Sequence, residues 1–196
     1  MAKIQSNKVV TNIDSCLLMS WLSLAWHTGT CTVTGGNLLS WLTGTHGFTA
    51  NDIGSVAWFT PTGGTAGLYQ IASVGSTTTL TAVPVGFTAS NVSSVACGVG
   101  DTGAEWSQRD AVLDRTLQVH GTFGSGGTLG LFGSNDGVNW AIASDNTGTN
   151  LSITTVKVRN IFDGPLWYKP MLTGGDATTN LSALISLRGQ LPRAIQ

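Results

Sequence analysis

The pattern of apolar and polar residues predicts β-strands along most of the chain. After residue 29, short runs rich in β-branched and aromatic residues alternate with Gly, Thr and Asn, which is typical of an all-β region. These runs predict strands at residues 30–34, 55–60, 68–74, 77–83 and 92–99. Beyond residue 116 the alternation has a period of two, and we expect strands at residues 117–123, 128–132, 138–143, 151–158, 166–172 and 181–188. Six strands in about 75 residues predict a compact antiparallel β-sandwich.

One segment near the N-terminus fits a helix better than a strand. Its apolar positions recur at i, i+3, i+4 and i+7, Asp14 or Ser15 is the expected N-cap, and Gly29 ends the pattern. The stripe consists of Leu18, Trp21, Leu22 and Ala25, and apolar residues outside it indicate burial all round. The predicted fold class is therefore mainly β, with one N-terminal helix, an irregular β region and a C-terminal antiparallel β-sandwich.

Charge and composition divide the chain into four parts. We expect an N-terminal helix with a Thr/Gly-rich β region, a charged linker, a sandwich and a tail, at residues 1–100, 101–115, 116–188 and 189–196. Within the first part, residues 47–57 return as residues 86–96, with seven of eleven positions identical. The repeat indicates two equivalent turn-plus-strand units or a coincidence of composition, and two copies are too few for a solenoid or propeller.

Charged residues are scarce and unevenly placed. Only 10% of the 196 residues are charged and the net charge is −1, where an ordinary globular chain has roughly 25% charged residues. Between Asp14 and Asp101 the only charged residue is Asp52, although 86 positions lie between them. Because charged residues are depleted from interface cores, we expect much of this region to contact other protein copies. An exposed sheet rich in Thr and Ser is the alternative.

The expected assembly is a homo-oligomer that also binds other proteins. The candidate interface residues are the aromatic side chains Trp21, Trp26, Trp41, Trp58 and Phe59. The terminal segments 1–13 and 189–196 carry little core pattern, so we expect them to act as arms across neighbouring subunits. The near-neutral balance and the lack of basic clusters disfavour nucleic acid and a membrane surface as partners.

Residues that could carry out catalysis are scattered. Cys16, Cys31 and Cys97 are widely spaced and predict buried free thiols, and the three histidines have no companion at metal-ligand spacing. The sequence contains no nucleophile elbow, zinc-protease helix or P-loop. We therefore expect no enzyme activity, no metal and no cofactor.

The strongest local signal is a hairpin near the centre of the predicted sandwich. Asp136 and Gly137 lie between two β runs, where Gly supplies the positive φ of the turn. The predicted structural residues of this hairpin are Asn135, Asp136, Gly137 and Trp140. Pro170 cannot donate a hydrogen bond to a neighbouring strand, so its strand is expected to be an edge strand or bulged.

Three segments of the sandwich resemble small β-sandwich proteins of tailed-bacteriophage virions. Residues 117–123 read LQVHGTF, residues 133–140 read GSNDGVNW and residues 166–175 read LWYKPMLTGG, with departures from the family pattern at Trp167 and Lys169. The resemblance implies a virion component without enzyme activity, made in the host cytoplasm. We expect a capsid decoration or cement protein that binds the major capsid protein or other virion proteins. A tail, head-completion or baseplate protein is the structural alternative.

The hairpin is also similar to one in discoidin-type domains, which are glycan-binding β-sandwiches. This resemblance implies a second possible function, in which Trp140 or Trp167 is exposed and stacks on a sugar ring. The alternative is that both tryptophans are core or cross-strand residues.

Overall fold

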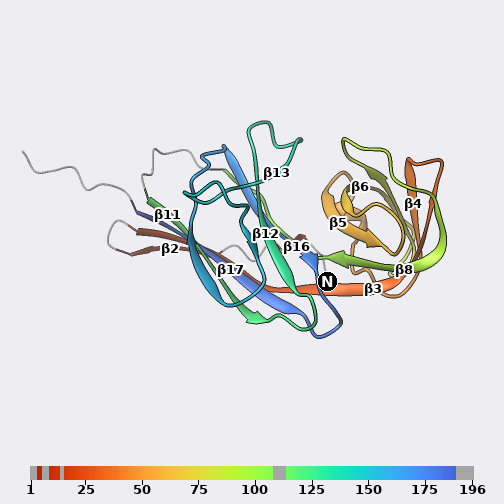
Figure 1. The fold of residues 1–196 in the computed structure, drawn as a ribbon, viewed down its shortest axis with the longest axis horizontal. Coiled ribbons are helices and arrows are strands. Elements are labelled where there is room, and N and C mark those ends of the chain that lie inside the picture. Colours follow the sequence, from red (N-terminus) through yellow and green to blue (C-terminus); the bar gives the residue numbers. More distant parts are fainter. Residues whose placement is uncertain (1–3, 6–8, 14–15, 108–113, 189–196) are drawn as a thin grey trace, which may run out of the picture.

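The computed structural model describes residues 4–5, 9–13, 16–107 and 114–188 and shows a mainly β protein (Figure 1). Strands account for 59% of it and helix for 2%, with a 3-10 turn η1 at Ala50–Asp52. The mainly β class predicted from the sequence is confirmed. Within the described ranges, no helix has the length and apolar character needed to cross a membrane.

Six strands close into a barrel on one side of the molecule (Figure 1). They are the second half of β3 (Cys16–Thr34), β4 (Leu38–Thr43), β5 (Val56–Pro61), β6 (Gly67–Val74), β7 (Leu80–Pro84) and β8 (Val92–Gly100). The order around the barrel is β3-β4-β7-β6-β5-β8, and β8 pairs back with β3. All five strands predicted for this region fall in these elements, whereas β4 was not predicted.

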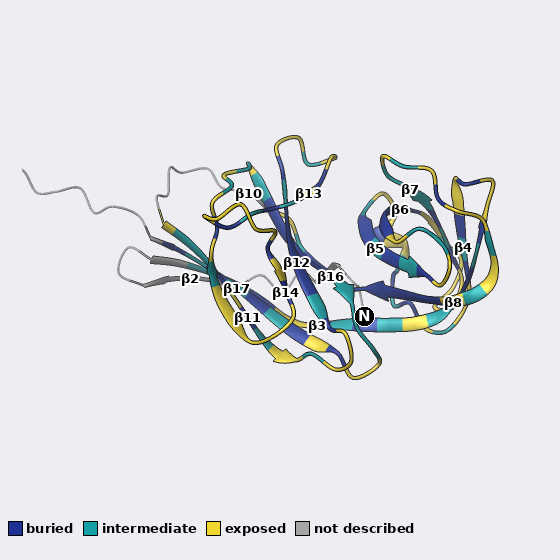
Figure 2. Cartoon of the chain, viewed as in Figure 1, coloured by how far each residue is buried: buried dark blue, intermediate teal, exposed yellow. Residues whose placement is uncertain are grey.

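The barrel encloses a core of its own (Figure 2). Alternate residues of each strand point inward, so Trp41, Phe59 and Tyr69 are at most 1% exposed. Their rings meet edge to face, with centroids 6.2 Å apart for Trp41 and Phe59 and 5.5 Å apart for Phe59 and Tyr69. Cys31 and Cys97 are buried free thiols in the same cluster, as the sequence predicts.

The two copies of the sequence repeat lead into neighbouring barrel strands. The first copy contains η1 and enters β5, and the second enters β8, which pairs antiparallel with β5. Phe48 and Phe87 occupy the same position in the two copies, and both pack against the barrel core. The repeat therefore corresponds to two turn-plus-strand units, although only the first contains a 3-10 turn.

Two sheets form the other side of the molecule and share a second core. One contains the first half of β3 with β2 (Val9–Ile13), β11 (Asp114–Thr122), β15 (Lys157–Asn160) and β17 (Asn180–Arg188). The other contains β1 (Ile4–Gln5), β9 (Thr102–Gly103), β10 (Trp106–Ser107), β12 (Thr128–Ser134), β13 (Ala141–Ile142), β14 (Ser152–Ile153) and β16 (Trp167–Gly174). Leu117 and Ile185 of the first sheet and Leu131 and Tyr168 of the second belong to one buried cluster, as in a β-sandwich. We call this part the sandwich.

The predicted N-terminal helix is wrong, because its residues form the first half of β3. A β-bulge explains the error: Leu22 and Ser23 lie opposite Ser182 alone, and Ser23 has a positive φ of 57°. The extra residue shifts the alternation of buried and exposed side chains by one position. The buried apolar residues are therefore Met19, Trp21, Leu24 and Trp26. The step of three from Trp21 to Leu24 imitates a helical repeat. We expected this segment to be buried as a helix. It is a strand that pairs with β17 on one side and β2 on the other.

The expectation of an edge or bulged strand at Pro170 is confirmed in its bulged form, because the pairing of β16 with β12 shifts register between Leu172 and Gly174. β16 is central, with β12 on one side and the two-residue strands β9 and β10 on the other. The interruption between β9 and β10 lies beside Pro170, and Gly103 packs so closely on its ring that an added Cβ would come within 2.7 Å. The missing N–H of proline is therefore accommodated by a break in the neighbouring strand.

β3 belongs to both parts of the molecule. Its residues up to Ala25 pair with β17, and those from Trp26 onward pair with β8 and β4. The expected linker at residues 101–115 holds β9 and β10, and its residues 108–113 lie outside the described part. The proposed domain limits at residues 100 and 116 stay predictions.

The expected N-terminal arm is partly integrated into the fold. Ile4–Gln5 pairs with β9, and Val9–Ile13 pairs with β3 of the same chain. These two stretches therefore act as strands within one subunit. The expected C-terminal arm, residues 189–196, lies outside the described residues.

Candidate functional site at the barrel–sandwich junction

The predicted hairpin forms at the end of β12, with a longer connection than a two-residue turn. β12 and β13 pair antiparallel, and residues 135–140 connect them. The Asp136 carboxylate accepts hydrogen bonds from Ser134 Oγ at 2.8 Å, Val138 N at 2.8 Å and both Asn139 nitrogens at 2.7 and 2.8 Å. These bonds, with Asn139 first, lower the pKa of Asp136. The carboxylate thus holds the shape of this loop.

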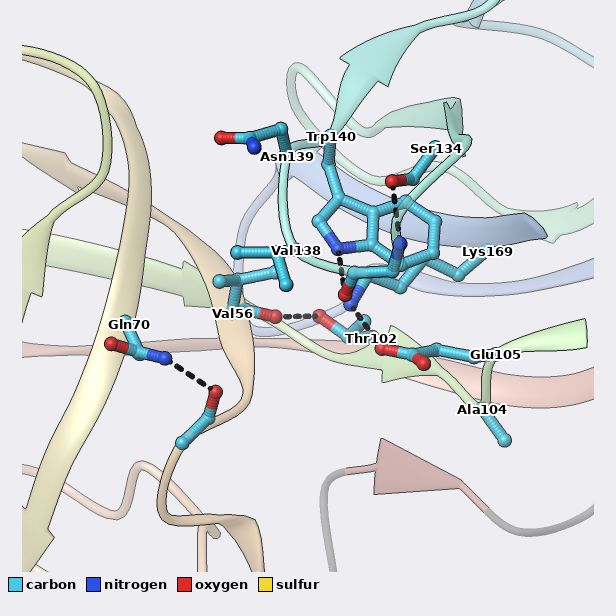
Figure 3. A network of polar contacts seen from close by, with 12 residues as sticks. Val56, Gln70, Thr102, Ala104, Glu105, Ser134, Val138, Asn139, Trp140 and Lys169 are labelled. Atoms are coloured by element: carbon cyan, nitrogen blue, oxygen red, sulfur yellow. Dashed lines mark hydrogen bonds and ion pairs between the residues drawn. The ribbon is translucent and has the colours of Figure 1, made fainter. Parts of the chain in front are cut away.

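The other predicted hairpin residues have structural contacts as well. Asn135 Oδ1 accepts a hydrogen bond from Leu166 N at 3.1 Å, and Gly137 has a φ of 73°. Trp140 Nε1 donates to Gly137 O at 3.2 Å (Figure 3). The loop therefore places the Trp140 ring at the junction between the sandwich and the barrel.

A buried lysine lies beneath this tryptophan. Lys169 of β16 is 2% exposed, and its Nζ lies 4.0 Å from the centroid of the Trp140 ring. The same Nζ lies 3.2 Å from Glu105 Oε1, whose side chain is 43% exposed (Figure 3). Burial lowers the pKa of Lys169, and the attraction of Glu105 opposes that shift. In the sequence, Lys169 stands out only as a departure from a family pattern, although a lysine inside an apolar strand is itself a signal of an unusual environment.

Apolar side chains from both parts meet around this pair. Val56 and Leu68 come from β5 and β6 of the barrel, and Phe132 and Met171 come from β12 and β16 of the sandwich. Trp58 of β5 packs against Phe132, with ring centroids 6.0 Å apart at an interplanar angle of 45°. The contact is therefore a third apolar cluster, which joins two separately cored parts.

Two cavities flank Trp140 at this junction. The smaller, of about 80 Å³, is lined by Lys169, Glu105, Val138 and Gln70, and Gln70 Nε2 donates to Gly54 O at 2.9 Å (Figure 3). The larger, which we call the junction pocket, has a volume of about 390 Å³. Its apolar floor consists of Trp58, Leu68, Phe132 and Trp140, and its polar rim of Asn150, Ser152 and Thr173.

The candidate interface residues lie mostly in the cores of the single chain. Trp21, Trp41 and Phe59 are at most 1% exposed, and Trp26 is 6% exposed. These rings are covered within one subunit, and the intersubunit contact that we expected of them stays a prediction. Trp58 alone of the five is only half-buried, and it lies at the junction pocket. The periodicity of each strand was readable in the sequence, but which neighbour covers its apolar face was not.

Polar residues elsewhere also have structural partners. His27 Nε2 lies 3.2 Å from Asp101 Oδ1, and Asp101 Oδ2 accepts a hydrogen bond from Ala25 N at 2.8 Å where β3 passes between the two parts. Hydrogen bonding to Cys31 and burial raise the pKa of Cys97. Among the described residues, no group of three His, Cys, Asp or Glu side chains is placed to hold a metal ion.

Comparisons with known proteins find no matching family, no similar curated protein and no similar solved structure.

Proposed function

We propose that this chain is a non-enzymatic structural protein of a tailed-phage virion, in first place a capsid decoration or cement protein. The observation that carries the proposal is the uncharged surface of the barrel. From Trp26 to Gly100 the only formally charged residue is Asp52, which is 2% exposed. Its carboxylate accepts hydrogen bonds from Thr49 N and Oγ1 at 2.7 and 2.9 Å. A surface without charge suits burial against other subunits, because charges are costly to desolvate.

Hydroxyl groups and isolated leucines cover this surface. Thr30 and Thr43 are hydrogen-bonded at 2.8 Å, and Ser73 and Thr81 at 2.7 Å, with one exposed and one half-buried residue in each pair. On the outer face of β4, Leu38 and Leu42 are 38% and 43% exposed. We call the face formed by Leu38, Ser40 and Leu42 the β4 face. It offers apolar area flanked by paired hydroxyls, and we infer that it docks on the shell or on another copy.

The carboxylates of the sandwich support a structural role. Asp145 Oδ1 accepts hydrogen bonds from Thr147 N and Thr149 N. Asp145 Oδ2 also forms an ion pair with Arg159 Nη1 at 3.0 Å. Asp176 holds another loop through Ser125 N and Thr178 N, and hydrogen bonds from Thr178, Ser125 and Thr179 lower its pKa to about 2. Acidic side chains that are committed to loop geometry leave little for acid–base catalysis.

The three segments that resemble virion proteins all lie in the sandwich, one in its first sheet and two in its second. β12 and β16 pair from Thr128↔Gly174 to Ser134↔Trp167, which brings residues 133–140 beside residues 166–175. β11, which holds residues 117–122, packs on them across the shared core. The likeness therefore follows a structural unit, which supports the virion proposal.

Solution mass tests the self-association that the proposal expects. We expect the purified chain to self-associate at micromolar concentration in light scattering, and Leu42→Lys to weaken that association because it places a charge on the β4 face. The matched control is Val158→Lys, which changes an exposed residue of the sandwich. A monomeric wild type, or equal effects of both variants, would contradict self-association through the barrel.

Location in a particle distinguishes the proposed role from its runner-up. We expect electron microscopy of virions produced from the encoding genome to show copies spread over an icosahedral shell. A ring on the tail axis would instead indicate a tail, head-completion or baseplate protein. Virions that lack the chain altogether would overturn both forms of the proposal.

A further inference from the structure

The junction pocket has the size and position of a ligand site. Its volume of about 390 Å³ falls within the range of about 300–1,000 Å³ of small-molecule sites. It lies where the barrel meets the sandwich, and contacts between two separately cored parts are a common place for such sites. Its position differs from that of the β4 face, so the assembly proposed above leaves its use unexplained.

The chemistry of the lining selects an uncharged ligand. The described residues that line the pocket are all uncharged. Lys169 and Glu105 line the smaller cavity on the other side and already pair with each other. A charged ligand would therefore lose its hydration without gaining a counter-charge.

The pocket is also amphipathic. The floor offers the rings of Trp58 and Phe132, and the half-buried Trp58 has more accessible ring surface than Trp140, which is 8% exposed. The rim carries the amide of Asn150 and the hydroxyls of Ser152 and Thr173, of which Asn150 and Ser152 are exposed. A fitting ligand has an apolar face for the rings and hydrogen-bonding groups along its edge.

A neutral pyranose has this combination, with C–H groups on one face and hydroxyls around the ring. We propose that the junction pocket binds a neutral pyranose, with Trp58 as the stacking ring and Asn150, Ser152 and Thr173 as partners of the sugar hydroxyls. Trp140 acts as a wall of the site, because Lys169 occupies one side of its ring. The glycan-binding residue is thus Trp58 of the barrel, and neither of the two sandwich tryptophans singled out from the sequence.

Nuclear magnetic resonance on the full chain tests this site directly. Methyl α-glucopyranoside, methyl β-galactopyranoside, maltose and lactose are titrated as probes. We expect at least one of them to shift the indole N–H resonance of Trp58, with a dissociation constant of about 1 mM. N-acetylneuraminic acid, a charged sugar, should bind more weakly than the best neutral probe.

Matched variants separate binding from folding. Trp58→Ala is expected to weaken binding at least about ten-fold, equivalent to the loss of one stacking contact. Asn150→Ala, at an exposed position, should weaken it several-fold without affecting the thermal melt. Trp167→Ala is the control, because Trp167 is another half-buried tryptophan that does not line the pocket.

Three results would overturn the proposal. They are no shift of Trp58 with any neutral probe, equal losses in Trp58→Ala and Trp167→Ala, or binding of an apolar probe such as hexanol in the absence of saccharide binding. The last result would identify a purely apolar pocket. None of these outcomes bears on self-association, which is measured separately on the β4 face.

Discussion

At the scale of single residues, the contacts of Asp136 and Lys169 determine how each charged group responds to pH. Asp136 accepts four hydrogen bonds within its own loop, and Lys169 is enclosed between Trp140 and Glu105. The pKa of each group is lowered, but for opposite reasons. Bonding to the charged form stabilises the Asp136 carboxylate, whereas burial destabilises the Lys169 ammonium.

Asp136→Ala should lower the free energy of unfolding at neutral pH, because the loop before Trp140 loses its acceptor. The folded-state pKa of Asp136 lies below its usual value of 3.8, so its stabilisation is present above that value and is lost as the pH falls through the folded-state pKa. Urea unfolding of both proteins at about pH 7 and about pH 2.5 measures this difference. A gap between them that is unchanged at low pH would contradict the role given to the carboxylate.

Lys169→Met should change the pH dependence of stability in the alkaline range. The folded-state pKa of Lys169 lies below its usual value of 10.5, so between these two values the unfolded chain binds more protons. Wild-type stability therefore rises with pH there relative to the variant, which has no titrating amine. Chemical unfolding at neutral and alkaline pH gives the difference; parallel curves would show that Lys169 titrates normally.

At the scale of elements, β3 determines how the chain is organised. Its bulge at Leu22 and Ser23 shifts the alternation of side chains by one residue. Met19 and Trp21 before the bulge and Leu24 after it therefore all face the sandwich core. A one-residue slip would send these side chains to the opposite face. The same step of three residues made the segment resemble a helix, so the sequence pattern misled at the position where the backbone departs from regular pairing.

Ser23→Gly should stabilise the protein by up to about 1 kcal/mol, because glycine adopts a positive φ without the penalty of a Cβ. The matched control is Thr28→Gly in the same strand, where φ is not positive. That change should cost about 0.5–1 kcal/mol, as glycine does inside strands. Thermal melts of the three proteins compare them, and destabilisation by both variants would argue against strain at the bulge.

At the scale of the whole molecule, the two parts depend on each other unequally. Among the described residues, the buried residues of the barrel core lie between Cys31 and Val99, and the barrel strands, counting β3 from Trp26 onward, lie within residues 26–100. The sandwich core requires Met19, Trp21 and Leu24, which precede the barrel in the sequence. The barrel is thus inserted between the first strand of the sandwich core and the rest of it.

A fragment of residues 26–100 should therefore fold alone, whereas residues 101–196 should not fold unless residues 16–25 are restored to them. Circular dichroism and thermal unfolding provide the comparison, with a cooperative transition expected for the first fragment only. A cooperative transition for residues 101–196 alone would show that the sandwich core tolerates the loss of β3.

The sequence by itself determined the mainly β class, most strand positions and the loop of Asp136 and Gly137. These features depend on local rules, namely a period of two, β-branched composition and the positive φ of glycine. Tertiary structure decided the rest. Whether Trp21 and Trp41 face a core or a partner, why Lys169 is buried and how Trp58 and Phe132 form a pocket all depend on which distant strands meet. Such contacts leave no mark in the spacing of neighbouring residues, because they arise from the closure of the barrel and its packing on the sandwich.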